Sequence, residues 1–191
     1  GHLTHGWKVN FSGVYYNAVQ YQTGPDGLLN YDELEKLVKK EKPKILFCGA
    51  TAYPRLYNYP RLAQIAHAVD AYFIADIAHE AGLIAAGVIP SPVGHADIIT
   101  TTTHKTLRGP RGAIILVTEK GLKRDADMGK KIDKAVFPGL QGGPHNNTSA
   151  GIAISLQKAA SKAFVHYAKA IVSNAKVLAA ALIKEGFQLA T

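Results

Sequence analysis

The sequence predicts an α/β fold in which a mostly parallel sheet is flanked by helices. Short apolar runs of strand length alternate with longer segments in which apolar residues recur at helical spacing. Strands that alternate with helices are typical of parallel sheets. The chain has 191 residues, of which 47% are hydrophobic and 19% charged, a composition that suits one ordinary core and not a disordered segment. We therefore expect residues 1–191 to belong to a single domain.

Four apolar runs are the predicted strands. They are residues 44–49 (KILFCG), 71–75 (AYFIA), 97–101 (DIITT) and 113–117 (AIILV). None of them approaches the roughly 18 apolar residues that cross a bilayer. The sequence therefore predicts no membrane span.

Three segments are the predicted helices. Residues 32–41 are charged with one apolar face, and Pro43 ends this helix before the first strand. Residues 59–69 also have apolar residues at helical spacing. Residues 148–185 are rich in alanine, and we expect one long helix or two in series, closed near Gly186.

Charge and cysteine content limit the classes of protein. The formal net charge is +8 and the pI is near 9.5, which favours a lysine-rich surface or an affinity for an anionic ligand such as a phosphorylated cofactor. Nucleic-acid binding is not favoured, because no run of basic residues interleaves with aromatic ones. The single cysteine, Cys48, excludes an intrachain disulfide and fits a reducing compartment. No signal peptide is recognisable. Because the chain begins at Gly1 and not at Met, we expect a piece of a longer protein.

Polar side chains follow three of the predicted strands, where an open sheet binds its ligands. Asp76 follows a buried run, so its carboxylate must be paired: it caps the next helix or faces a cationic ring nitrogen. Lys105 follows four threonines and is either a surface lysine or an amine activated by burial. A lysine and a carboxylate spaced by one strand-helix unit suit pyridoxal phosphate (PLP), which needs an amine for its aldehyde and an acid for its pyridine nitrogen.

Two glycine-rich loops could offer backbone amides to a phosphate. They are residues 108–112 (RGPRG) and 138–144 (PGLQGGP). Gly-Pro pairs also mark ordinary turns, so each loop alone is a weak indication. The sequence predicts no metal site.

Five segments, in order along the chain, resemble the serine hydroxymethyltransferase family. They are residues 1–6 (GHLTHG), 9–13 (VNFSG), 74–87 (IADIAHEAGLIAAG), 100–112 (TTTTHKTLRGPRG) and 137–146 (FPGLQGGPHN). The resemblance covers essentially the whole chain and the middle of the family's length. It implies the aspartate-aminotransferase-like, or type I, fold of PLP-dependent enzymes.

The resemblance also implies roles for single residues. Lys105 matches the lysine that forms the Schiff base with PLP, and Asp76 matches the aspartate that pairs with the pyridine nitrogen. His79 matches a histidine near the phenolic oxygen, and His2 one that stacks on the ring. Further matches to cofactor-side residues are Thr51, Thr102 and His104, and Gly142 and Gly143 match a turn that reaches the phosphate held by the neighbouring subunit.

Other positions carry expectations of a different kind. His5 matches no residue with such a role and is expected to be structural, and Arg111 matches a loop arginine behind the site. Thr51 stands where the family commonly has serine, which keeps the hydroxyl but restricts its rotamers. Residues 119–131 are expected to form a surface insertion.

The activity implied by the resemblance is the interconversion of serine and glycine, with tetrahydrofolate accepting the one-carbon unit as 5,10-methylenetetrahydrofolate. A cytoplasmic homodimer, or a dimer of dimers, with shared sites is implied as well. The family's catalytic glutamate lies upstream of Gly1, and its carboxylate-binding arginine lies downstream of Thr191, so we expect the chain alone to be inactive. The alternatives are another type I PLP lyase, such as a threonine aldolase, and a non-catalytic RNA-binding fragment.

Overall fold

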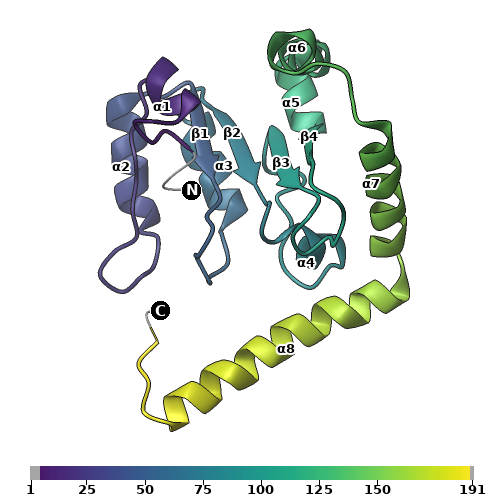
Figure 1. The fold of residues 1–191 in the computed structure, drawn as a ribbon. Coiled ribbons are helices and arrows are strands. Elements are labelled where there is room, and N and C mark those ends of the chain that lie inside the picture. Colours follow the sequence, from purple (N-terminus) through teal and green to yellow (C-terminus); the bar gives the residue numbers. More distant parts are fainter. Residues whose placement is uncertain (1–4, 190–191) are drawn as a thin grey trace.

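A single sheet organises the protein, which is described here by a computed structural model covering residues 5–189 (Figure 1). Its strand order is β1 (Ile45–Cys48), β2 (Tyr72–Asp76), β3 (Ile98–Thr102) and β4 (Ala113–Val117). The first three strands are parallel to one another, and β4 pairs with β3 in the antiparallel direction. The prediction of an α/β fold with a mostly parallel sheet is confirmed.

The long helices are those that the sequence predicted. Helix α3 (Tyr59–His67) packs on β2, and α2 (Tyr31–Glu41) packs on α3. The alanine-rich segment forms two helices in series, α7 (Asn146–Ala159) and α8 (Lys162–Lys184), which meet at an angle (Figure 1). Ser161 is the N-cap of α8, and its side chain accepts a hydrogen bond from the amide of Phe164 at 3.3 Å. The remaining helices are α1 (Phe11–Tyr15), α4 (Ala81–Ala85), α5 (Glu119–Arg124), α6 (Met128–Lys134) and the π-helical segment η1 (Ala135–Leu140), which contains a cis Phe137–Pro138 peptide.

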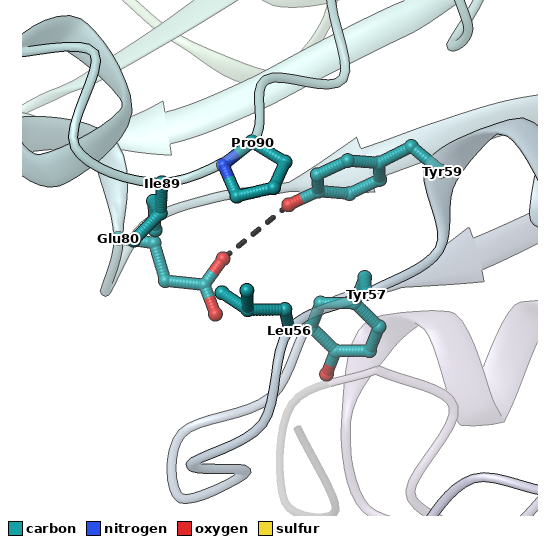
Figure 2. Close-up of a pocket in the computed structure, with 6 residues that line it drawn as sticks. All are labelled: Leu56, Tyr57, Tyr59, Glu80, Ile89 and Pro90. Atoms are coloured by element: carbon teal, nitrogen blue, oxygen red, sulfur yellow. Dashed lines mark hydrogen bonds between the residues drawn. The ribbon is translucent and has the colours of Figure 1, made fainter.

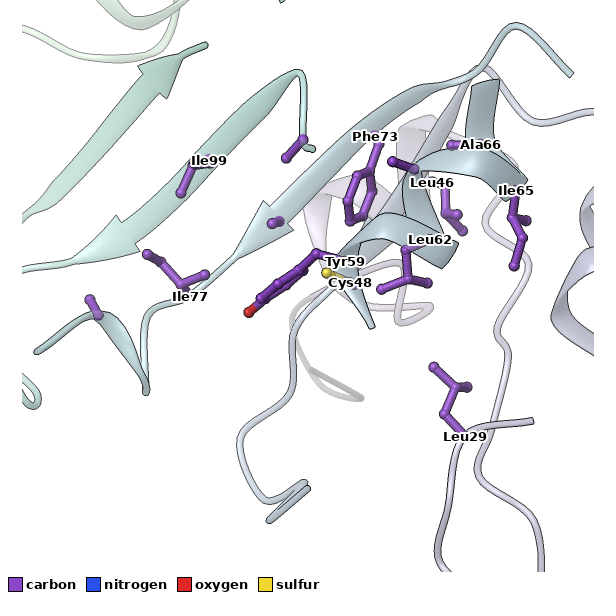
Figure 3. Close-up of a cluster of buried hydrophobic side chains, with 14 of the residues drawn as sticks. Leu29, Leu46, Cys48, Tyr59, Leu62, Ile65, Ala66, Phe73, Ile77 and Ile99 are labelled. Carbon is purple, nitrogen blue, oxygen red and sulfur yellow. The ribbon is translucent and has the colours of Figure 1, made fainter. Parts of the chain in front are cut away.

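The hydrophobic core lies between the sheet and α3 (Figure 3). Phe73 of β2 and Leu62 of α3 are completely buried, and Ile99 of β3 is 2% exposed. The middle strand β2 is buried along its centre, as expected for a parallel strand covered on both faces. The outer strand β1 instead alternates, with Ile45 and Phe47 exposed. The core therefore fixes β2 and β3, the two strands whose carboxyl ends carry Asp76 and Lys105.

A buried carboxylate ties the opposite end of the sheet together. Asp97, just before β3, has no exposed surface; its Oδ2 accepts the amide of Phe73 at 2.7 Å and lies 3.0 Å from Nε2 of His67. Arg124 of α5 donates to the carbonyl of Ala71 at 2.8 Å and to the carboxylate of Asp70 at 2.6 Å. This network joins β2, β3, α3 and α5 away from the predicted site.

The segment expected to be a surface insertion is only partly at the surface. Residues 119–131 form α5 and the start of α6, and both Gly121 and Met128 are buried. A Cβ on Gly121 would come within 2.4 Å of the carbonyl oxygen of Asp97. The expectation was wrong for these residues, because α5 packs against the amino end of β3. Within residues 5–189, no helix combines the length and the apolar character needed to cross a membrane.

Candidate active site

The carboxyl ends of β1 and β2 lie in direct contact at the predicted site. Gly49, immediately after β1, has φ +133, and a Cβ there would lie 2.3 Å from the carbonyl oxygen of Asp76. Only glycine combines this backbone angle with so close an approach. The chain following β1 therefore lies directly against the residue that ends β2.

Lys105 and His79 meet beyond the carboxyl ends of β3 and β2. Nζ of Lys105 lies 3.1 Å from Nε2 of His79. Burial lowers the pKa of His79 below its ordinary value, and the positive charge of Lys105 lowers it further. A neutral imidazole at this position accepts the hydrogen bond from the lysine amine.

Asp76 carries the negative charge of the site. Its Oδ1 accepts the amide of Ala78 at 3.0 Å, and its Oδ2 lies 3.1 Å from Nε2 of His5. Burial alone raises the pKa of Asp76, but the hydrogen bonds from His5 and Ala78 and the charges of His5 and Lys105 bring it below its ordinary value. Asp76 does not cap the following helix, because the residue at the N-cap of α4 is Glu80. Its ionised carboxylate is therefore available to balance a cation.

The loop that carries Lys105 is closed on itself by Thr103. This threonine has no exposed surface, and its hydroxyl donates to the carbonyl of Pro110 at 2.7 Å. Its amide donates to the carbonyl of Gly112 at 3.0 Å, and its carbonyl accepts the amide of Gly109 at 2.8 Å. The amide of Gly109 is thus used within the loop, which argues against its predicted use as a phosphate ligand.

A second threonine fastens the same loop to α4. The hydroxyl of Thr106 donates to the carbonyl of His79 at 3.0 Å and accepts the amide of Gly82 at 2.9 Å. A Cβ on Gly82 would lie 2.6 Å from the carbonyl oxygen of Thr106. The short distance between Lys105 and His79 therefore depends on the close approach of α4 to this loop.

His104 has a buried polar atom that no described residue pairs with. Its Nδ1 is inaccessible to solvent and has no hydrogen-bond partner among the residues that the structure describes. A buried polar atom left unpaired costs about 1–3 kcal/mol. The resemblance assigns His104 to the cofactor side, and a bound group with a complementary atom would satisfy this nitrogen.

Other predicted residues lie further from this cluster or outside the described chain. The hydroxyl of Thr102 is 3.5 Å from the carbonyl of Ala78, a long and weak hydrogen bond. Thr51 is exposed in the segment that follows β1. His2 precedes the described residues 5–189, so its predicted stacking role stays a prediction.

The second glycine-rich loop is exposed. Gly142 and Gly143 lie between η1 and α7, and a Cβ at either position would meet no atom within 4 Å. Arg111 is also exposed, in the loop before β4. The structure does not bring these three residues into contact with Lys105 or Asp76.

The contact between His5 and Asp76 was missed by the sequence analysis, in which His5 was expected to be structural. The two residues are distant in the sequence, and no local pattern links them. The only signal in the sequence is the histidine itself, within the segment GHLTHG that resembles the family.

A second group that was missed lies beside the site, where the hydroxyl of Tyr59 donates to Oε2 of Glu80 at 3.4 Å in a small pocket (Figure 2). Burial raises the pKa of Glu80. In the described part of the chain, no three His, Cys, Asp or Glu side chains form a potential metal site.

The fold and the site define a class of protein. A mostly parallel sheet with a lysine, a histidine and an ionised aspartate at neighbouring strand ends is the arrangement of the large domain of type I PLP-dependent transferases. The sequence model of serine hydroxymethyltransferase matches residues 1–191. The chain belongs to the serine hydroxymethyltransferase family.

Curated relatives agree with this assignment. The chain is similar to proteins named serine hydroxymethyltransferase from Acidothermus cellulolyticus (53% identical over 190 residues), Desulfotalea psychrophila (50% over 191) and Acidiphilium cryptum (50% over 192). These alignments cover 99–100% of this chain and 43% of each relative. The chain thus spans less than half the length of the curated relatives it matches.

Proposed function

We propose that this chain is the cofactor-binding part of a PLP-dependent serine hydroxymethyltransferase. The enzyme would interconvert serine and glycine and transfer the hydroxymethyl carbon to tetrahydrofolate, giving 5,10-methylenetetrahydrofolate. The observation that carries the proposal is the 3.1 Å contact between Lys105 and His79, beside an ionised Asp76. The family membership supports it.

The residues present fit PLP. Lys105 would hold the aldehyde carbon, Asp76 the ring nitrogen and His79 the ring oxygen, while the unpaired Nδ1 of His104 offers a further polar contact. When bound, PLP supplies an electron-withdrawing ring that stabilises negative charge at the amino-acid Cα. Thr51 and Thr102 would line the same side, and His2 would cover the ring.

Each of the three central residues has a task that follows from its charge. The carboxylate of Asp76 keeps a nearby ring nitrogen protonated, because a negative charge raises the pKa of a neighbouring cation. Lys105 must lose a proton from Nζ before it acts as a nucleophile. Nε2 of the neutral His79, at 3.1 Å, would accept a hydrogen bond from that amine and orient it.

The remaining parts of the proposal concern assembly and location. Residues 1–191 would form part of one cofactor-binding domain, and the residues that bind the substrate carboxylate and the folate would lie largely outside this chain. The exposed turn with Gly142 and Gly143 suits contact with a second copy, so we propose a homodimer or a dimer of dimers. We propose a cytoplasmic enzyme with no nucleic-acid partner.

The decisive test is covalent labelling of Lys105. The protein is incubated with PLP, its visible spectrum is recorded, and it is then reduced with borohydride and mapped by peptide mass spectrometry. We expect an absorbance band and one labelled lysine, Lys105, with both lost in Lys105→Ala and retained in the surface control Lys169→Ala. Labelling spread over many lysines and unchanged in Lys105→Ala would refute the proposal.

The reaction itself is tested in the complete protein that contains these residues. Cleavage of serine that depends on tetrahydrofolate supports the proposed transfer. Cleavage of β-hydroxy amino acids that is equally fast without folate would favour an aldolase instead.

A further inference from the structure

We propose that His5 is a positioning residue that holds the carboxylate of Asp76 in the orientation required by a protonated ring nitrogen. The inference rests on the proposed function, because Asp76 has this task only when PLP binds. His5 would not touch the reacting atoms and would act through Asp76 alone.

The geometry around Asp76 supports this role. Nε2 of His5 lies 3.1 Å from Oδ2, and the amide of Ala78 donates to Oδ1 at 3.0 Å. The Asp76 side chain is 20% exposed, so water competes only weakly for these oxygens. With one partner on each oxygen the carboxylate cannot rotate freely, yet each ionised oxygen keeps an acceptor site for another donor.

His5 is itself held in place by the protein. Its ring packs on Phe47 of β1, with 5.3 Å between ring centroids and a 46° tilt. Its carbonyl accepts a hydrogen bond from the side-chain amide of Gln20 at 2.7 Å. A packing role alone would need only the ring; the placement of Nε2 against Asp76 is what points to positioning.

The charges of the site agree with the assignment. Burial by itself raises the pKa of Asp76, and the hydrogen bond from His5 is the largest of the effects that lower it. The other groups that lower it are the amide of Ala78 and the positive charge of Lys105. Without His5, part of the opposition to burial is lost and the carboxylate is less firmly ionised.

The test uses the complete protein and two substitutions at His5. His5→Phe keeps a ring for Phe47 but removes the nitrogen, whereas His5→Gln keeps an N–H donor at a similar reach. His166→Phe, on the exposed side of α8, is the matched control. Circular dichroism confirms that each variant is folded before any ligand is added.

The first readout is a comparison of two ligands. The dissociation constant is measured for PLP and for its 1-deaza analogue, in which carbon replaces the pyridine nitrogen. Since a hydrogen bond to a charged group is typically worth about a factor of ten or more, we expect His5→Phe to bind PLP about tenfold more weakly. Its affinity for the deaza analogue should stay within about twofold of wild type, and His5→Gln and His166→Phe should bind both ligands as wild type does.

The second readout is the ¹⁵N chemical shift of the pyridine nitrogen of bound, labelled PLP. We expect the shift of a protonated ring in the wild type and in His5→Gln, and a move toward the unprotonated value in His5→Phe. Equal loss of affinity for both ligands in His5→Phe, with an unchanged ¹⁵N shift, would show a merely structural role and overturn the inference. If the wild type bound no PLP at Lys105, the proposed function itself would fail, which separates the two conclusions.

Discussion

The close approach of α4 to the lysine loop gives a sharp prediction for Gly82→Ala. The new Cβ would lie 2.6 Å from the carbonyl oxygen of Thr106 and 2.9 Å from its Cβ, so the backbone next to Lys105 must move. Overpacking of this kind costs about 1–3 kcal/mol, while replacing a helical glycine by alanine gains about 1 kcal/mol. We therefore expect the free energy of unfolding to fall by up to about 2 kcal/mol.

Gly129→Ala is the matched control for this substitution. Gly129 lies in α6, and a Cβ there would meet no atom within 4 Å, so only the gain of about 1 kcal/mol in helix propensity should remain. Urea unfolding measures both effects, and a PLP titration measures the displacement of Lys105. The reasoning would be refuted if Gly82→Ala were as stable as Gly129→Ala and bound PLP as the wild type does.

Two further predictions concern the buried carboxyl groups. Asp97→Asn should lower the free energy of unfolding by about 3 kcal/mol, because His67, Arg124 and the amide of Phe73 lose the charged acceptor that they share; a loss below 1 kcal/mol in urea unfolding would contradict this. For Glu80 the folded-state pKa is raised, mainly by burial, so its contribution to stability is present at low pH and is lost as the pH rises through the folded pKa. Glu80→Gln should therefore be more stable than wild type at pH 7, with the difference vanishing below about pH 4.5; a difference that is constant with pH would argue against it.

The fold could be predicted from the sequence because its signals are local. The apolar run at residues 113–117 coincides with β4, and each boundary of the other strands differs by one residue. Whether residues 148–185 form one helix or two was left open, since alanine continues through the break and Ser161 acts as a cap only when the chain turns there. The short helices α5 and α6 were missed, because their burial depends on contacts such as that of Gly121 with Asp97.

The site could be predicted only where recognisable motifs carry its residues. Asp76, His79 and Lys105 lie in two motifs whose strands are neighbours in the sheet, so the topology alone brings them together. The pairing of His5 with Asp76 depends on the packing of the amino-terminal segment against Phe47 of β1, which nothing local in the sequence specifies.

Burial shifts the pKa values of the acid and the histidine of the site in opposite directions, and the neighbours of each group decide its charge. Burial disfavours any charge, which raises the pKa of Asp76 and lowers that of His79. His79 has the positive charge of Lys105 beside it and stays neutral, whereas Asp76 has His5, the amide of Ala78 and Lys105 and stays ionised. Under the proposed function, the site would therefore combine an anion for a ring nitrogen with a neutral hydrogen-bond acceptor for the lysine amine. Removing the hydrogen bond between His5 and Asp76 would weaken that separation of charge.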